Sequence, residues 1–112
     1  MNQEKQFAVV YDFNVKPGKV EAFTEAWRTL TQLIYTYEGS LGSRLHRGSE
    51  YHYIAYALWP DRDTWANSGS NLPESAEEVR KQLREACKEI KTLHEITVVD
   101  DLIQGSPSDP LK

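Results

Sequence analysis

YHYIAYALWPDRDTW, residues 51–65, predicts a strand that leads into a short helix. Successive side chains of a strand point to opposite faces. One predicted face holds Tyr51, Tyr53, Ala55, Ala57 and Trp59, and the other holds His52, Ile54, Tyr56 and Leu58. Both sets are mostly apolar, so we expect both faces to be covered. Asp61 is suited to cap a helix over about residues 61–69, which would present Trp65.

The segment FAVVYDFNVKPGKVEAF, residues 7–23, predicts a strand and the start of a long helix. Residues 7–15 are rich in β-branched and aromatic side chains, which favour a strand. Lys16-Pro17-Gly18 breaks that pattern. From Lys19 onward, apolar residues recur every three or four positions, which predicts an amphipathic helix that Gly39 caps.

Three further elements follow in the predicted order. Residues 41–47 favour a strand that forms a hairpin with the aromatic strand across Gly48-Ser49-Glu50. Pro73 or Ser75, the latter with capping-box spacing, is expected to open a second long helix. The apolar stripe of that helix consists of Ala76, Val79, Leu83, Ala86 or Cys87, and Ile90. Residues 93–103 predict the last strand.

The order βαββαβ, with one extra short helix, predicts an α+β domain of the ferredoxin-like class. We expect a four-stranded antiparallel sheet with both long helices on one face. A second copy of the sheet is the simplest cover for the other apolar face, so we predict a homodimer through that face. Residues 1–104 are predicted to form this single domain. Residues 105–112 contain two prolines and little to bury, which is typical of a flexible tail.

Composition argues against several classes of partner. The net charge is −4 and no block of Lys and Arg is present, so we expect no nucleic acid partner. No apolar run approaches the roughly 20 residues of a membrane span, so no membrane partner is expected either. The polar start MNQEKQ does not resemble a secretory signal, and Cys87 is the only cysteine. We therefore expect a cytoplasmic protein.

Three short motifs resemble those of the antibiotic biosynthesis monooxygenase superfamily of dimeric α+β barrels. They are the strand–Pro17-Gly18–helix opening, Gly39-x-Leu41-Gly42, and Trp59-x-Asp61-x-x-x-Trp65. The resemblance covers roughly residues 7–103. The superfamily includes cofactor-free oxygenases of quinols and anthrones, haem-degrading enzymes, and members without known activity.

The resemblance implies a cofactor-independent monooxygenase that acts on a small aromatic, quinol- or anthrone-like substrate. One alternative is a non-catalytic dimeric protein of the same fold that binds a small ligand. Another is a dimer in which all the aromatic side chains are structural.

Cofactor-free oxygenation needs an aromatic pocket that excludes water, and polar groups that hold the developing anion. The polar candidates are Tyr11, Asn14 and Asn67. The candidates for the pocket wall are Phe13, Phe23, Tyr53 and Trp65, and the family places a pocket tryptophan at the position of Trp65. Asn14 also suits the turn that follows its strand, and Asn67 suits a helix end. Trp27 and Trp59 are interpreted as core residues.

No metal or other cofactor is expected. His46 and His52 could face each other across the hairpin, but two ligands are too few for a metal site. Haem-degrading members carry an asparagine where this chain has Tyr11, and a histidine about ten residues after the tryptophan, where this chain has none. Many oxygenase-like members also have histidines within residues 65–75. The sequence therefore predicts a pocket wall without an evident general base.

Overall fold

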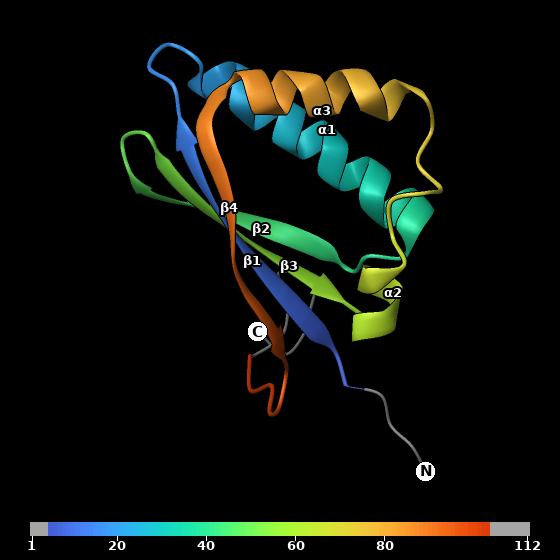
Figure 1. Cartoon of the computed structure of the whole chain (residues 1–112). Coiled ribbons are helices and arrows are strands. Elements are labelled where there is room, and N and C mark those ends of the chain that lie inside the picture. The colour runs from blue at the N-terminus through green and yellow to red at the C-terminus, as the bar shows by residue number, and fades with distance from the viewer. Residues whose placement is uncertain (1–4, 104–112) are drawn as a thin grey trace, which may run out of the picture.

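The structure, a computed structural model, describes residues 5–103. Its elements are β1 (Phe7–Val15), α1 (Val20–Glu38), β2 (Gly42–Ser49), β3 (His52–Trp59), α2 (Arg62–Ala66), α3 (Ser75–Glu85) and β4 (Cys87–Thr97). The strands form one antiparallel sheet in the order β2-β3-β1-β4. In Figure 1, α1 and α3 lie side by side on one face of this sheet. The predicted α+β ferredoxin-like fold is confirmed.

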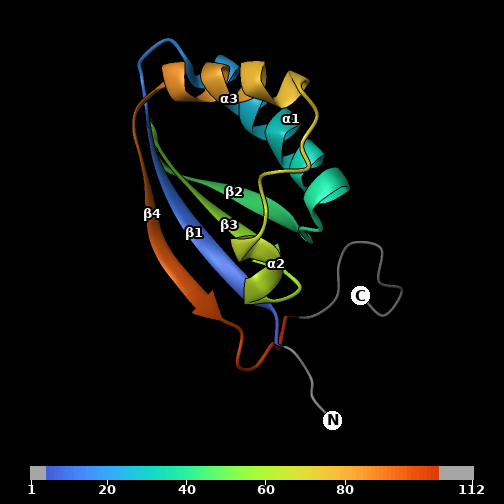
Figure 2. The same ribbon diagram turned by 45° about the vertical axis from the view of Figure 1, so that its right-hand side comes forward.

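The sheet is open, with β2 and β4 as its edges, and it does not close into a barrel within the chain. Figure 2 shows it as a curved wall, with the described helices all on its inner side. The opposite face, called the outer face below, carries no helix of the described part of the chain. A barrel would therefore need a second chain.

β1 is one of the two central strands, because it pairs with both β3 and β4. Phe7, Val9, Phe13 and Val15 lie on one face of β1, where they point toward the helices and are buried. β3 follows the same rule, with Tyr53, Ala55 and Trp59 buried on the inner face. These two strands build the floor on which the helices lie.

Helix α1 ends at a left-handed residue, as predicted. Gly39 has φ +85° and follows Glu38, the last residue of the helix. This region of φ is costly for any residue with a Cβ atom. A Cβ atom on Gly39 would also lie 3.3 Å from Cγ2 of Thr64, so the glycine lets α2 approach the end of α1.

The prediction for the boundary between the second long helix and the last strand was wrong. Helix α3 ends at Glu85, and β4 begins at Cys87 and runs to Thr97. Residues 86–90 fit a helical stripe as well as they fit a strand. Pairing with the end of β1 decides between the two, because Cys87 lies opposite Val15 and the Lys16 N–H donates to the Ala86 carbonyl at 2.9 Å.

The start of α3 and the end of β4 also differ from the prediction. The expected capping box does not form, because α3 is preceded by Glu74 and has no side-chain cap. At the end of β4, the Val98 N–H alone continues the ladder among the described residues, donating to the Gln6 carbonyl at 2.8 Å. Within residues 5–103, β1 begins at Phe7, so residues 99–103 have no neighbouring strand to pair with.

The β2–β3 hairpin is tighter than predicted, since Ser49 pairs with His52 across a turn at Glu50-Tyr51. His46 lies opposite Ile54, so the hairpin does not bring His46 and His52 together. Instead, the His52 ring contacts the Asp12 carboxylate on the outer face.

None of the helices within residues 5–103 has the length and hydropathy needed to cross a bilayer. The predicted tail, residues 105–112, lies outside the described residues, so the boundary at residue 104 stays a prediction.

Candidate functional site

A cavity of about 250 Å³ lies between the sheet and the two long helices, and it is partly open to solvent. It is lined by Tyr11, Phe13, Trp27, Leu30, Thr31, Ile34, Ser40, Ser43, Ala55, Ala57, Trp59, Arg80, Leu83 and Ile90. Ser43, Ala55 and Ala57 share the inner face of β2 and β3. Because these three side chains are small, they leave space beneath the large side chains of α1.

Most of the lining is apolar, and several of its polar groups are already engaged. The Ser43 hydroxyl donates to the Tyr56 carbonyl at 3.0 Å. The Ser40 hydroxyl oxygen accepts from the Gly42 N–H at 2.9 Å. The cavity therefore suits an apolar ligand that is oriented by a few other polar groups, as is usual for small-molecule sites.

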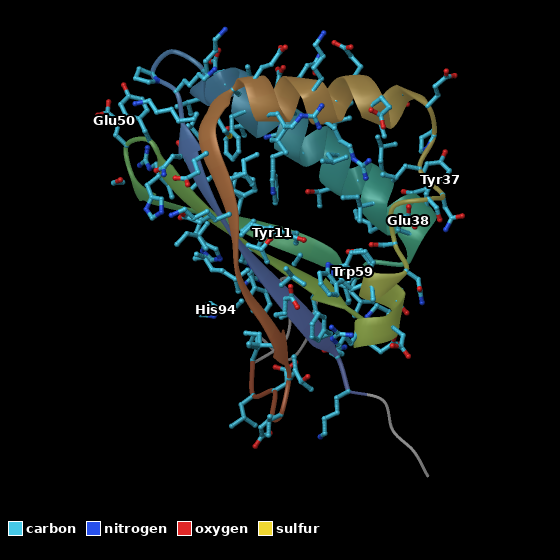
Figure 3. All side chains as sticks on the ribbon, in the orientation of Figure 1. Tyr11, Tyr37, Glu38, Glu50, Trp59 and His94 are labelled. Carbon is cyan, nitrogen blue, oxygen red and sulfur yellow. The ribbon has the colours of Figure 1, made fainter. Side chains whose placement is uncertain are left out.

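Trp59 supplies one such group. Its side chain is 4% exposed, and its Nε1 atom is buried with no hydrogen-bond partner among the described residues. A buried N–H without an acceptor costs about 1–3 kcal/mol. Such a group calls for an explanation, and because Trp59 also lines the cavity, it is a candidate site residue. Figure 3 labels Trp59 at the end of β3, close to α2.

Tyr11 supplies the second group. It lies in the middle of β1 (Figure 3) and lines the cavity. Burial raises the pKa of its hydroxyl, and the charge of Glu95 raises the pKa further, while a hydrogen bond from the Trp65 indole N–H lowers it. Burial is the largest of these effects, so Tyr11 stays protonated at neutral pH. It can donate its proton in a hydrogen bond, but it is a poor base.

Trp65 does not line the cavity, but it acts on Tyr11, which does. It lies on α2, where the Asp61 carboxylate accepts from the Thr64 N–H at 2.8 Å, as the sequence predicts for a cap. The Trp65 ring lies 5.3 Å from the Phe7 ring, centroid to centroid. The guanidinium carbon of Arg62 lies 5.9 Å from the Trp65 ring, within the range of a cation–π contact.

Glu38 holds the loop between α2 and α3 against the end of α1. Its side chain is 7% exposed, and one carboxylate oxygen accepts from the N–H groups of Gly69 and Asn71, at 2.8 and 2.9 Å. The other oxygen accepts from Asn71 Nδ2 at 3.2 Å. Figure 3 shows Glu38 where this loop passes the helix end. We call this group of contacts the Glu38 clasp; it was not foreseen from the sequence.

The structure brings only some of the predicted site residues into the cavity. Tyr11 and Phe13 line it. Phe23 and Tyr53 lie behind Phe13 in the core, where the Phe23 ring is 5.0 Å from Phe13 and 5.3 Å from Tyr53. All three belong to one buried cluster. Phe23 and Tyr53 therefore support the pocket wall from behind.

The two predicted asparagines are not in the lining. Asn14 points to the outer face, paired between His52 and Glu89. Asn67 follows α2, and its backbone N–H donates to the Asp63 carbonyl at 3.0 Å. Trp27 and Trp59, interpreted from the sequence as core, do line the cavity, as does Arg80. The signal for this cavity was the pair of alanines on the inner face of β3, opposite the helices.

Residues 5–103 contain no group of three or more His, Cys, Asp or Glu side chains placed to hold a metal ion. Cys87 is buried, and burial raises the pKa of its thiol to about 11. It is therefore a thiol of low reactivity.

Comparison with known proteins adds a family and a set of similar folds. The family model described as antibiotic biosynthesis monooxygenase matches residues 6–71. No protein of curated function matches the sequence significantly. Thirty-eight chains of solved structures match significantly.

Three of these structures illustrate the likeness. SnoaB, a cofactor-independent oxygenase from Streptomyces nogalater, is 17% identical with a TM-score of 0.70, over 89% of this chain and 99% of its own. A candidate antibiotic biosynthesis monooxygenase from Caulobacter crescentus is 18% identical with a TM-score of 0.71, over 88% and 93%. Another, from Bordetella bronchiseptica, is 21% identical with a TM-score of 0.68, over 86% and 99%. At such identities, the likeness shows the shared fold.

Proposed function

This chain belongs to the antibiotic biosynthesis monooxygenase family, and from that premise we propose that it is a cofactor-independent monooxygenase of a small aromatic, quinol- or anthrone-like substrate. One observation carries the proposal: an apolar cavity of about 250 Å³ is lined in part by Trp59, whose buried N–H has no partner within residues 5–103. The volume lies just below the roughly 300–1,000 Å³ of ligand pockets, which favours a small ligand. Similarity in fold to a cofactor-independent oxygenase supports the same reading.

The reaction needs no reductant other than the substrate. In an anthrone, the CH₂ group between two aromatic rings becomes C=O. One atom of O₂ bonds to that carbon, and the other leaves as water with the two hydrogen atoms of the CH₂ group. The substrate supplies all four electrons that reduce O₂. Its enolate or phenolate form is the species that passes the first electron to O₂, so the site must favour this anion.

Two donors belong to side chains that line the cavity, and we assign both to the oxygen of that anion. The Trp59 N–H has no acceptor within the described chain, and the Tyr11 O–H stays protonated. Donors aimed at a developing oxyanion in a site with little water are effective because they need no reorganisation. Phe13, Trp27 and Trp59 provide aromatic surface beside them for the ring system.

The side chains that line the cavity include no carboxylate and no imidazole. The proton of the substrate must therefore leave to solvent through the open side of the cavity. Substrates with an acidic hydroxyl or CH₂ group fit this arrangement best, because they ionise without a strong base.

Oxygen uptake with anthrones and naphthohydroquinones, without added metal or flavin, tests the proposed reaction. We expect uptake above the uncatalysed rate, and one ¹⁸O atom from ¹⁸O₂ in the product by mass spectrometry. Trp59→Phe removes the buried donor and should lower the rate, while Tyr37→Phe on the exposed face of α1 should not. Products without ¹⁸O, or rates equal to the uncatalysed rates for the whole panel, would refute the monooxygenase.

The missing base favours a second candidate, a non-catalytic protein that binds a small aromatic ligand in the same cavity. It shares the cavity and its donors with the first candidate but predicts no turnover. Ligand binding without incorporation of ¹⁸O would support this alternative.

We also propose that two copies of the chain associate through the outer face to form a dimeric α+β barrel. Tyr56 on the inner strand β3 and Ile96 on the edge strand β4 both lie on that face and are 37% and 44% exposed, so the face presents large side chains to solvent. Val99, Leu102 and Ile103 add exposed apolar side chains just beyond the sheet. A cytoplasmic location stays a prediction from the sequence.

A further inference from the structure

Arg80 is the only charged residue among the fourteen that line the cavity. It lies on α3, one turn before Leu83, and its neighbours in the lining are mostly apolar. The side chain is 35% exposed. The guanidinium therefore borders both the cavity and water, so it keeps part of its hydration at a position where a ligand can reach it.

The charge of Arg80 is not neutralised by a close partner. The one ion pair found for it within residues 5–103 joins its Nη1 to Oε2 of Glu77 at 3.9 Å, one helical turn away. The Glu77 side chain is 77% exposed, and an exposed pair at this distance contributes little. A planar guanidinium offers donors in a fork that matches a carboxylate.

Resting on the proposed function, we propose that Arg80 is a specificity-determining residue that selects aromatic substrates with a carboxylate group. The ring system lies in the apolar cavity, and its oxygen accepts from Trp59 and Tyr11. The carboxylate reaches the guanidinium of Arg80 at the side of α3. A half-exposed site suits an ion pair of this kind, because neither charge has to lose all its water. The cavity size limits such a substrate to a few fused rings.

Binding of a matched pair of ligands tests this selection. The pair is 2-naphthoate and 2-naphthalenemethanol, which share a ring system and differ in charge. Quenching of Trp27 and Trp59 fluorescence reports binding, because both side chains line the cavity. We expect the wild-type protein to bind 2-naphthoate about 10- to 100-fold more tightly than the alcohol, as a charged hydrogen bond allows. This preference should fall as salt is raised.

Arg80→Gln should abolish the preference for 2-naphthoate and leave the affinity for the alcohol unchanged, which also shows that the cavity is intact. Arg80→Lys keeps the charge but not the fork, so it should retain part of the preference. Arg84→Gln is the matched control, because Arg84 lies on the same helix and is exposed. The proposal is overturned if the wild-type protein binds both ligands equally or neither, or if Arg84→Gln has the same effect as Arg80→Gln.

Oxygen uptake separates this proposal from the proposed function. Anthrone and an anthrone carboxylate form the second matched pair. Turnover of both at the same kcat/KM would overturn the role of Arg80 and leave the monooxygenase intact. Conversely, binding that depends on Arg80 without any turnover supports the selection of acidic ligands and refutes the monooxygenase.

Discussion

The Trp65 indole N–H is placed to donate to the hydroxyl oxygen of Tyr11 and lowers the pKa of that hydroxyl, so the short helix α2 and strand β1 meet at this pair. A tryptophan N–H can only donate, so the Tyr11 oxygen accepts and its own proton is left for another acceptor. The pair therefore orients the Tyr11 O–H. In the proposed reaction, Trp65 is a positioning residue and Tyr11 contacts the substrate.

Tyr11→Phe removes the hydroxyl and keeps the ring, so we expect kcat/KM to fall by about 10- to 100-fold with little change in the fold. Trp65→Phe removes the orienting bond and should have a smaller effect. The double variant should be no worse than Tyr11→Phe alone, because the two side chains act through one hydroxyl. Steady-state oxygen uptake measures all three. Fully additive losses, or an equal loss in Tyr37→Phe, would contradict the coupling.

The rate of oxygen uptake should rise with pH and follow the ionisation of the substrate. Burial raises the pKa of Tyr11, so Tyr11 remains a donor across the neutral range. Two substrates whose reacting groups differ in pKa should then give profiles displaced by the same difference. A shared inflection near neutral pH for both substrates would instead reveal a protein base.

Ala57→Leu should fill the cavity from the floor of the sheet. Extra methyl groups usually strain a packed core by about 1–3 kcal/mol, but here they enter empty space. We therefore expect thermal stability close to that of the wild-type protein, with loss of both ligand quenching and oxygen uptake. Ala22→Leu, on the exposed side of α1, is the control. Unchanged ligand binding in Ala57→Leu would mean that the ligand lies elsewhere.

Glu38→Gln should weaken the clasp on the loop between α2 and α3. The carboxylate accepts three hydrogen bonds at once, and a hydrogen bond to a charged group has a net contribution of about 1.5–3 kcal/mol. We expect a lower Tm and faster amide exchange at Gly69 and Asn71. Glu85→Gln, exposed at the end of α3, should change neither. Exchange at Gly69 that stays as slow as in the wild-type protein would argue against the clasp.

Ile96→Asp should disrupt the proposed dimer. Ile96 lies on the outer face opposite Ala8 and is 44% exposed in the single chain. A stable interface buries about 800 Å² per partner, and a carboxylate in its centre would be desolvated without a partner. Light scattering should show a dimer for the wild-type protein and a monomer for the variant. A wild-type monomer at micromolar concentration would refute the dimer.

The thiol of Cys87 should resist alkylation at pH 8, since burial raises its pKa to about 11 from an ordinary 9.0. A raised pKa in the folded state means that the protonated thiol is favoured by folding. This contribution is complete below pH 9 and is lost as the pH rises from 9 toward 11. Reaction with iodoacetamide should be slow until the protein unfolds. Rapid labelling of the folded protein would contradict the burial.

Local signals explain why β1 and α1 were predicted so closely. Residues 7–15 are rich in β-branched and aromatic side chains, Lys16-Pro17-Gly18 breaks the strand, and Gly39 ends the helix. The end of α3 could not be found in this way, because residues 86–90 fit both a helix and a strand. Pairing with β1, which is distant in sequence, decides their structure.

The site was harder to predict than the fold. Tyr11 and Asn14 are three residues apart in one strand. Because successive side chains of a strand point to opposite faces, these two lie on opposite faces of the sheet. The cavity itself depends on small side chains that come from two strands, and on their position beneath α1. Such a void is a property of packing between distant segments. The proposed role of Arg80 also depends on packing between distant segments, because Arg80 is on α3 and the rest of the cavity lining comes mostly from the sheet and α1.

The indole proton of Trp59 has no acceptor within residues 5–103, so its chemical shift can serve as a probe of ligand binding. The chain has three tryptophans, so a nitrogen–proton correlation spectrum should contain three indole signals. Trp65 gives the signal of a bonded proton, and Trp59 gives that of a proton without an acceptor. An oxygen-bearing guest in the cavity would move the Trp59 resonance downfield and leave that of Trp65 nearly in place. Candidate ligands could then be compared by the shift that each causes in the Trp59 signal, without a measurement of turnover.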